Sequence, residues 1–408
     1  MRILFVTQIV PYPPHGGVLQ RGYNLLRELG RQHEVHLCAF VHPDELRSEA
    51  DIARSREELG RFCKQVEYFE LWPKKSALHK LAALAAGVFY PLPFSVLAQK
   101  NARLARRVRD LCASGAVDVV HLDTIGLAPL RRFCGDVPTV LAHHNIESQL
   151  MERRADHEPG VFGRWYVRTQ AARLKRYERD QAPRFARNIT VSPLDSRQLE
   201  TIAPGARALD VSNGVDIDYF KPLDVAQEPA MVYTGGMNMF ANRDAVEWFI
   251  DEIWPRIRRE LPQAQFNAVG AYPSRRVLAA AAAGIGVNAP GFLADVRPLV
   301  GRSSIYVVPL RVGGGTRLKM VDAMAQGKAI VATSVGAEGI SGENGRHFVL
   351  ADDPDAFAAA VVRLIGDAPA RKRLGDAARR QAEEVYAWPG LAARLTQCYQ
   401  DALQEARR

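Results

Sequence analysis

Two cations stand at the start of a predicted helix in the C-terminal half of the chain. A strand expected at 305–310 is followed by Gly313-Gly314-Gly315-Thr316-Arg317-Leu318-Lys319 and then by a helical pattern. Cations in the first turn of a helix lie against the positive end of its dipole, which is unfavourable unless an anion joins them. A guanidinium, an ammonium and free loop N–H groups together can bind a diphosphate. The alternative is that both side chains point into water.

Two further turns place paired glycines between a strand and a helix. A strand at 3–7 leads to Gly16 and Gly17, and a strand at 231–234 leads to Gly235-Gly236-Met237-Asn238. Free N–H groups at a helix N-terminus attract anions, and glycine lets an anion come close because it has no Cβ. In open parallel sheets the ligand crevice forms at the carboxyl ends of the strands. The three turns therefore predict one ligand site between two domains that face a cleft.

The elements that must position these turns alternate between strand and helix along almost the whole chain. Apolar runs rich in Val and Ile, separated by helical patterns, predict parallel sheets covered on both faces. We expect strands at 3–7, 34–40, 66–71, 117–122, 139–144 and 188–191 in one half, and at 231–234, 265–269, 305–310 and 329–333 in the other. The predicted fold class is α/β, with two doubly wound, Rossmann-like domains.

The Pro204-Gly205 pair marks the predicted domain boundary. A helical pattern ends there, and the turn signal Asn213-Gly214 follows. We assign residues 1–205 to an N-terminal domain and residues 206–387 to a C-terminal domain. The segment 388–408 is a helical pattern with an apolar stripe, so we expect it to pack back onto the first domain.

Several phosphate-binding and catalytic motifs are missing from the sequence. It contains no Gly-x-x-x-x-Gly-Lys-Ser/Thr P-loop, no third glycine at dinucleotide spacing after Gly235-Gly236, and no Gly-x-Ser-x-Gly nucleophile elbow. The five cysteines form no Cys-x-x-Cys pair and have no histidine at zinc spacing. We therefore expect reduced cysteines in a cytosolic protein, no metal site, and a nucleoside diphosphate that serves as a leaving group.

The basic surplus of the chain lies in its first half. The net charge is +9, and residues 1–200 hold 30 Lys and Arg against 22 Asp and Glu. The uncharged stretch Leu81 to Ala98 contains Pro91 and Pro93, which favours a helix on a membrane surface or an ordinary core helix over a membrane span. The basic and aromatic segment from Arg153 to Arg187 fits a solvated helix face or contact with anionic lipid. Acidic residues interrupt it, which argues against nucleic acid. We expect a cytoplasmic protein, peripheral on the inner face of the membrane.

The order and spacing of these motifs resemble those of glycosyltransferase family 4, retaining enzymes of the GT-B fold, over nearly the whole chain. The resemblance rests on Gly16-Gly17 with Arg21, His143-His144-Asn145-Ile146-Glu147, Val191-Ser192, Ser212-Asn213-Gly214-Val215-Asp216 leading to Tyr219-Phe220, Thr234-Gly235-Gly236, and Gly313 to Lys319. It implies transfer of a sugar from a UDP-sugar or GDP-sugar to an acceptor hydroxyl, without a metal or another cofactor. The implied acceptor is a glycan or a lipid-linked sugar in cell-surface polysaccharide or glycolipid assembly. The N-terminal domain would bind the acceptor and the C-terminal domain the donor.

The resemblance also implies roles for individual residues. Arg317 and Lys319 would neutralise the leaving diphosphate, and His144 would hydrogen-bond the donor sugar. Asp322 would reach the nucleotide ribose, and Glu338 the base or the ribose. The other donor-binding residues would be Gly16, Gly17, Gly235, Gly236, Asn238, Gly314, Gly315 and Thr316.

Some positions leave alternatives open. Asp123 follows the strand at 117–122, so it would either orient an acceptor hydroxyl, together with Arg21, or cap a turn. The family pattern has two glutamates where this chain has Gly314 and Asp322, so the donor sugar is not predicted. Two other functions stay open. One is an NDP-sugar 2-epimerase of similar fold, and the other is a non-catalytic sugar-nucleotide-binding subunit.

Overall fold

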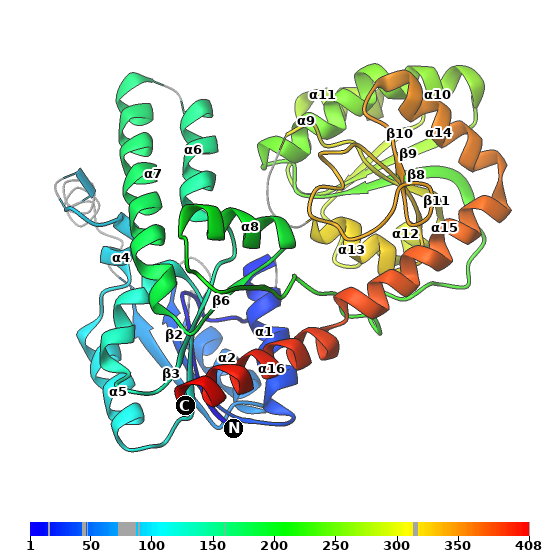
Figure 1. The fold of residues 1–408 in the computed structure, drawn as a ribbon. Helices are drawn as coiled ribbons and strands as arrows, with labels where there is room; N and C mark the ends of the chain where they lie inside the picture. Colours follow the sequence, from blue (N-terminus) through cyan, green and yellow to red (C-terminus); the bar gives the residue numbers. More distant parts are fainter. Residues whose placement is uncertain are drawn as a thin grey trace. The chain divides into compact units, whose positions relative to one another are not determined.

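The computed structural model describes residues 1–14, 17–42, 46, 48–71, 87–88, 90–158, 160–312 and 317–407. The chain divides into two compact units (Figure 1). Unit 1 comprises Met1–Asn213 and Leu391–Arg408, and unit 2 comprises Gly214–Gly390. The division falls a few residues after the boundary expected at 205/206, because one more short strand, β7 (Ala208–Asp210), pairs with the first sheet.

Unit 1 is built on a seven-stranded sheet with the order β3-β2-β1-β4-β5-β6-β7, and every pairing is parallel. The order reverses between β1 and β4, so the carboxyl ends of these two strands form the topological switch point. The remaining strands are β1 (Arg2–Thr7), β2 (Glu34–Val41), β3 (Gln65–Glu70), β4 (Val119–Leu122), β5 (Thr139–Ala142) and β6 (Arg187–Thr190).

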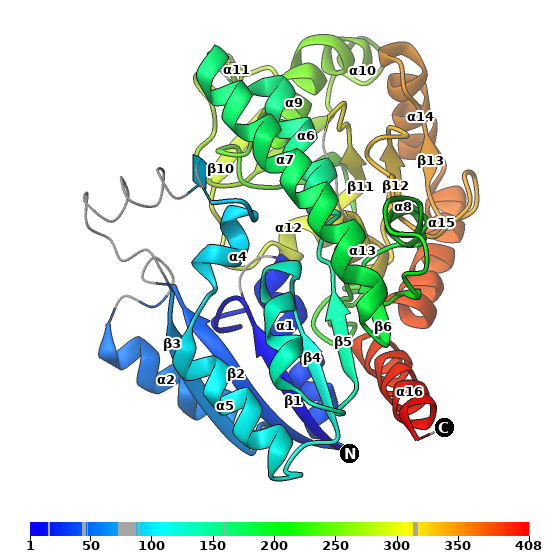
Figure 2. The same cartoon turned by 60° about the vertical axis from the view of Figure 1, so that its left-hand side comes forward.

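Helices cover both faces of this sheet (Figure 2). On one face, Leu4, Val6 and Phe40 pack with Val108 of α5 and Leu174 of α7 in a single buried cluster. The helices of unit 1 are α1 (Gly17–Gly30), α2 (Glu49–Gly60), α4 (Phe94–Ala98), α5 (Ala102–Ala113), α6 (Glu147–His157), α7 (Val161–Gln181), α8 (Pro193–Ile202) and α16 (Trp388–Ala406), with the 3₁₀ segments η1 (Ile125–Phe133) and η2 (Ala182–Arg184).

The last helix, α16, packs onto unit 1 from Leu391 onward, as the apolar stripe predicts. Leu391, Leu395, Tyr399 and Ala402 are each at most 1% exposed, whereas Leu403 is only partly buried. Polar contacts flank this stripe, because Nε2 of His33 lies 3.0 Å from Oγ1 of Thr396 and Arg187 pairs with Glu405.

Unit 2 has a six-stranded parallel sheet with the order β10-β9-β8-β11-β12-β13. Its strands are β8 (Glu228–Thr234), β9 (Gln265–Val269), β10 (Val287–Gly291), β11 (Ser303–Val308), β12 (Ala329–Ala332) and β13 (Val349–Leu350). Its helices are α9 (Phe240–Trp248), α10 (Trp254–Glu260), α11 (Arg275–Ala282), α12 (Arg297–Arg302), α13 (Leu318–Ala325), α14 (Pro354–Gly366) and α15 (Ala368–Gln381), with π-helical turns η3 (Phe249–Ile253) and η4 (Ala382–Tyr386).

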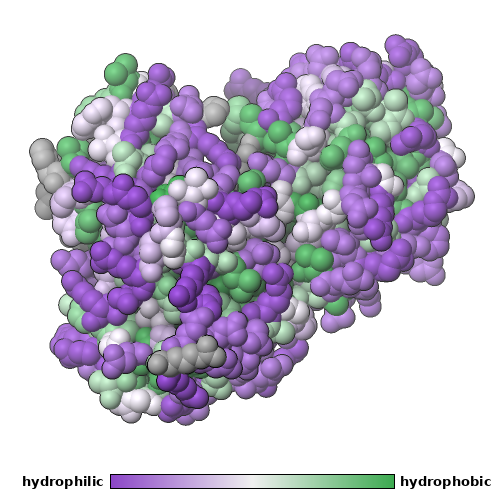
Figure 3. Space-filling view, in the orientation of Figure 1, coloured by the Kyte–Doolittle hydropathy of each residue, from purple (hydrophilic) through white to green (hydrophobic). Residues whose placement is uncertain are grey.

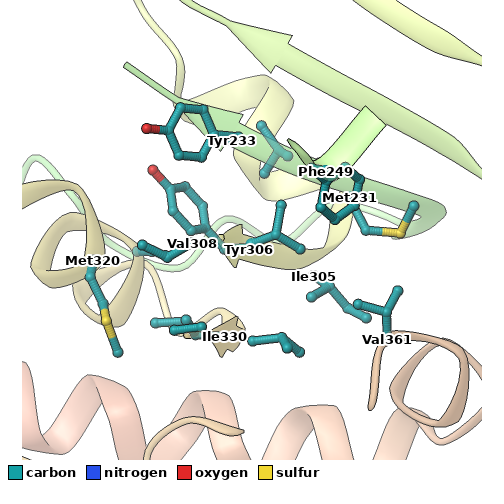
Figure 4. Close-up of a cluster of buried hydrophobic side chains, with 14 of the residues drawn as sticks. Met231, Tyr233, Phe249, Ile305, Tyr306, Val308, Met320, Ile330 and Val361 are labelled. Carbon is teal, nitrogen blue, oxygen red and sulfur yellow. The ribbon is translucent and has the colours of Figure 1, made fainter. Parts of the chain in front are cut away.

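The core of unit 2 carries two tyrosines among its apolar side chains. Tyr233 on β8 and Tyr306 on β11 are 0% and 1% exposed, in one cluster with Ile305, Met320 and Phe249. Figure 4 shows both phenol hydroxyls on the same side of this cluster. Buried tyrosine hydroxyls need partners, so these two mark a place where polar groups meet the core.

The uncharged stretch Leu81 to Ala98 lies partly outside the described residues, and its described part includes the five-residue helix α4. Within the described ranges, none of the helices is both long and apolar enough to cross a membrane.

Candidate active site

The carboxyl ends of β8 and β11 form the topological switch point of unit 2. The chain adds β9 and β10 on one side of β8, and β12 and β13 on the far side of β11. Open α/β sheets bind their ligands at such a point. The turn Gly235-Gly236 follows β8, and α13 follows β11 with Arg317 as its N-cap residue and Lys319 in its first turn.

The ammonium group of Lys319 is held by neutral groups at this point. Its Nζ donates to the hydroxyl of Tyr233 at 2.6 Å and to Oδ1 of Asn242 at 2.6 Å. It also lies 4.3 Å from the centre of the Tyr233 ring, a cation–π contact. Burial, and then the charge of Arg317, lowers the pKa of Lys319 to about 7. No described carboxylate contributes to this shift, so an anionic ligand would supply the missing opposite charge.

Gly235 makes room for this lysine. A Cβ at position 235 would lie 2.7 Å from Nζ of Lys319 and 3.0 Å from Nδ2 of Asn242, closer than side chains tolerate. The neighbouring Gly236 accepts a hydrogen bond from Asn242, and Asn238 is exposed beside it. Because Gly235 has no Cβ, the Lys319 amine can lie close to the backbone of the glycine pair.

Arg317 points toward the loop after β12. Its Nε and Nη2 donate to the carbonyl oxygen of Val335 at 3.3 and 3.2 Å, and Nη2 lies 3.7 Å from Oε2 of Glu338. The arginine is only 8% exposed. Arg317 thus contacts the loop after β12, whereas Lys319 contacts β8 and α9. The charge of Arg317 still acts on Lys319.

Asp322 lies one turn beyond Lys319 on α13. Burial raises the pKa of its carboxyl to about 7, so a large fraction is protonated at neutral pH. The neighbouring Tyr306 shares a hydrogen bond with Thr234, and burial, to which the charge of Asp322 adds, raises the pKa of its phenol. A protonated Asp322 can donate a hydrogen bond, which an ionised one cannot.

Unit 1 holds a second cluster, centred on Asp123 directly after β4. One oxygen of Asp123 lies 3.1 Å from Nε2 of His144 and the other lies 3.9 Å from Nε2 of His121. Burial opposes ionisation of Asp123, but the two histidines outweigh it and keep its pKa below the usual range. Nε2 of His144 is buried, and Asp123 is the polar group that the described structure places beside it.

A residue of α16 completes this cluster. The hydroxyl of Tyr399 lies 2.8 Å from Nδ1 of His121, whose ring stacks on Phe5 at 4.1 Å. Burial lowers the pKa of His121, although Asp123 works in the opposite direction. The contacts therefore run from Tyr399 through His121 and Asp123 to His144.

Two other predicted residues of unit 1 have structural partners. Arg21 is buried on α1, and its Nη1 donates to the carbonyl oxygen of Ser212 at 2.8 Å. Burial lowers the pKa of Arg21 to about 10, opposed by Asp123. His143 lies next to His144, with Nε2 3.1 Å from Oδ1 of Asn188, and burial lowers its pKa to about 4. His143 is therefore neutral at pH 7.

The structure brings Gly235, Gly236, Arg317, Lys319, Asp322 and Glu338 to one edge of unit 2, and Arg21, Asp123 and His144 to unit 1. Gly17 is the first residue of α1. Four predicted residues lie outside the described part of the chain: Gly16, Gly314, Gly315 and Thr316. Among the described residues, no group of three or more His, Cys, Asp or Glu side chains is placed to hold a metal ion.

The sequence analysis missed four members of these clusters. Tyr233 and Asn242 contact Lys319, His121 lies beside Asp123, and Tyr399 contacts His121. One signal was present for two of them. Tyr233 and His121 are polar residues inside otherwise apolar strands that end at the switch points.

Comparison with known families identifies the class of protein. Residues 15–219 match the family described as Glycosyltransferase Family 4, and residues 228–367 match the one described as Glycosyl transferases group 1. The first match covers half of the chain, which therefore belongs to glycosyltransferase family 4. It is a glycosyltransferase enzyme.

Two relatives are similar in sequence. A 44.6 kDa protein of Klebsiella pneumoniae, described as an uncharacterized protein in the cps region, is 23% identical over 88% of this chain and 90% of its own length. An MMP alpha-(1->4)-mannosyltransferase of Mycolicibacterium hassiacum is 39% identical, over 22% of each chain.

Solved structures confirm the GT-B fold predicted from the sequence. Sucrose-phosphate synthase from Thermosynechococcus elongatus is similar with a TM-score of 0.68 and 16% identity, covering 99% of this chain and 100% of that one. HepE of Anabaena in complex with UDP gives a TM-score of 0.66 at 16% identity, covering 97% and 99%.

Proposed function

We propose that this enzyme transfers a sugar from a UDP-sugar or GDP-sugar to an acceptor hydroxyl, with retention of configuration at the anomeric carbon. The observation that carries the proposal is the Lys319 amine, held by neutral groups at the switch point of unit 2 with Arg317 as a second cation. A diphosphate is the ligand that suits two cations beside a glycine turn. Solved complexes of HepE with UDP and with UDP-glucose support a uridine donor.

In the proposed reaction the acceptor oxygen bonds to the anomeric carbon on the face from which the diphosphate leaves. The bond between that carbon and the phosphate oxygen breaks, and its electron pair stays on the diphosphate. The departing oxygen takes the proton of the acceptor hydroxyl, so no protein nucleophile takes part. Lys319 and Arg317 stabilise the added negative charge, which is the main catalytic contribution and needs no metal or other cofactor.

His144 hydrogen-bonds the donor sugar in this proposal, as the family resemblance implies, through the ring nitrogen that does not face Asp123. Asp123 then acts on His144 by fixing the ring, a different role from the acceptor contact that the sequence predicts. In unit 2, Asp322 meets the ribose as a hydrogen-bond donor or acceptor. Glu338 contacts the nucleoside, and Asn238 and the glycine turns contact the phosphates.

The proposed acceptor is a glycan or lipid-linked sugar in the assembly of a cell-surface polysaccharide or glycolipid. The relative in the cps region of Klebsiella pneumoniae supports this setting. A peripheral position on the cytoplasmic face of the membrane fits the free end of the α6–α7 hairpin, where Figure 3 shows apolar surface. Val161, Phe162 and Trp165 there are 87%, 66% and 50% exposed. Exposed aromatic side chains of this kind favour a membrane interface.

The test combines binding with product analysis. UDP, GDP, ADP and TDP are compared by thermal shift, because a nucleotide that binds the native state raises Tm. We expect UDP or GDP to give the largest shift. The matching NDP-sugar is then incubated with and without acceptor, and the anomeric configuration of the product is read by NMR. An inverted product would contradict retention, and a changed sugar without acceptor would instead show an epimerase.

A further inference from the structure

A groove on unit 1, between α7 and α8, is lined by four cations. It has a volume of about 650 Å³, and its walls include Lys175, Arg176 and Arg179 of α7 and Arg197 of α8. Gln149 of α6 also lines it. Figure 3 shows hydrophilic side chains over the stretch where these helices pack together.

The charges in this groove are only half balanced by the protein. Nζ of Lys175 lies 3.5 Å from Glu152, and Nε of Arg179 lies 3.1 Å from Asp180. Neither Arg176 nor Arg197 forms an ion pair with a carboxylate in the described part of the chain. Two guanidinium groups on facing helices therefore share one groove without an anion between them.

Stabilisation of the helix ends does not account for the pair Arg176 and Arg197. A cation in the last turn of a helix is favourable, which explains Arg179 near the end of α7. Arg197 lies in the middle of α8 (Pro193–Ile202), where that effect has faded. Guanidinium groups bind phosphate oxygens in pairs, and a groove of this size holds more than one phosphate.

The groove is tied to the segment that carries His144. Helix α6 begins at Glu147, three residues after His144, and Gln149 of its first turn reaches the groove wall. The backbone N–H and the hydroxyl of Ser148 donate to the buried carboxylate of Glu178 on α7, at 3.2 and 2.5 Å. The start of α6 is thus fixed to the helix that supplies three of the four cations.

We infer that this groove binds the diphosphate of a phosphate-bearing acceptor, and so holds the acceptor beside the His144 segment. The inference rests on the proposed transferase function for the identity of the acceptor, but not for the binding of the diphosphate. The diphosphate is either attached to the acceptor sugar or free in solution, and the experiment separates the two.

Inorganic pyrophosphate is the first probe, titrated calorimetrically into the full chain at low salt with UDP at saturation to occupy the donor site. The double variant Arg176→Gln/Arg197→Gln should weaken pyrophosphate binding at least 10-fold. The control Arg164→Gln/Arg168→Gln, which removes the same charge from exposed positions of α7 outside the groove, should change it less than 2-fold. Equal losses in both variants, or no binding to the unsubstituted chain, would overturn the inference.

The same titration in Lys319→Ala keeps the two proposals apart. If the donor site is wrongly assigned, UDP will bind Lys319→Ala as it binds the unsubstituted chain. Groove binding of pyrophosphate should persist in this variant in either case, and vanish on adding Arg176→Gln/Arg197→Gln. Vesicles of phosphatidylglycerol and of phosphatidylcholine form another arm. Groove-dependent binding to phosphatidylglycerol without binding of soluble pyrophosphate would assign the groove to membrane headgroups and overturn the inference.

A transfer assay then distinguishes an attached diphosphate from a free one. With an isoprenyl-diphosphate sugar as acceptor, Arg176→Gln/Arg197→Gln should raise the acceptor KM about 10-fold and leave kcat and the donor KM nearly unchanged. The same sugar without its diphosphate should show no such change. An equal rise in KM for both acceptors would contradict binding of the acceptor diphosphate.

Discussion

The buried charges of the two units are balanced in different ways. In unit 1, Asp123 lies beside His121 and His144, which lower its pKa, and its charge acts to raise the pKa of the buried Arg21 against the effect of burial. In unit 2, the charge of Arg317 lowers the pKa of Lys319, whose hydrogen-bond partners Tyr233 and Asn242 are neutral. Arg317 itself forms an ion pair at 3.7 Å with Glu338, whose side chain is 39% exposed. Ionisable neighbours thus lower the pKa of the buried carboxylate in unit 1, whereas no described carboxylate contributes to the pKa shift of Lys319 in unit 2. This difference is one reason why we propose that unit 2 binds the charged leaving group.

The largest expected effect comes from removing Lys319, one of the two cations at the switch point of unit 2. Lys319→Ala should lower kcat/KM by about 100-fold or more, the scale of losing one preorganised charge contact. The control is Lys372→Ala, since this lysine is 74% exposed and pairs with Asp376 on the surface of α15. Steady-state kinetics with the donor identified by thermal shift makes the measurement. Near-normal turnover of Lys319→Ala would remove the basis of the comparison.

A smaller effect is expected from crowding the same lysine. Gly235→Ala places a Cβ 2.7 Å from Nζ of Lys319, so the amine must move from its place. We expect donor affinity to fall about 10-fold, which corresponds to about 1.4 kcal/mol. Gly366→Ala is the matched control, because nothing lies within 4 Å of a Cβ at that position. Calorimetric titration with UDP compares them, and equal affinities would show that Lys319 need not stay where it is.

A smaller loss of activity is expected from a change in the Asp123 cluster of unit 1. Tyr399→Phe removes the partner of His121 Nδ1, so we expect a stability loss of about 1–2 kcal/mol and a several-fold fall in kcat. Thr396→Val removes another α16 contact, that to His33, and should cost stability without lowering kcat. Denaturant unfolding and kinetics separate the two readouts. If both variants lose activity equally, the His121 contact only anchors the helix.

The smallest expected effect is the uptake of protons when UDP binds. The pKa of Lys319 is about 7 in the free protein, against an ordinary value of 10.5. A bound diphosphate favours the charged amine and raises this pKa, so at pH 8 binding of UDP should take up a fraction of one proton. At pH 5.5 the amine is already protonated and the uptake should disappear. Calorimetry in buffers of different ionisation enthalpy measures it, with Lys319→Met as control. Proton release at pH 8 would contradict this assignment.

Much of the fold could be predicted, because buried parallel strands are continuous apolar runs. The strands that the sequence analysis missed are short or interrupted. β7 has three residues, β13 has two, and β10 contains Pro290 and Gly291. Local patterns of this length do not distinguish a strand from a loop, and only pairing with a formed sheet creates them.

The site was predictable where glycine and charge stand together in sequence. Arg317, Lys319 and Gly235 fall in this class. Asn242, which contacts Lys319, and Tyr399, which contacts His121, could not be predicted, because these contacts are distant in the chain. Tyr399 and His121 are 278 positions apart, and Lys319 and Asn242 are 77 apart. Arg21 is expected to contact the acceptor, which stays a prediction; its hydrogen bond to the Ser212 carbonyl oxygen, 191 positions away, could not be predicted from local sequence.

The return of α16 to unit 1 has a consequence for how the protein is made. During synthesis the first 213 residues leave the ribosome long before Leu391, so the surface awaiting Leu391, Leu395 and Tyr399 stays open while unit 2 is translated. Unit 1 therefore finishes folding only after α16 has been synthesised. A fragment ending at Asn213 would carry an uncovered apolar strip and would aggregate unless the missing helix were supplied as a peptide.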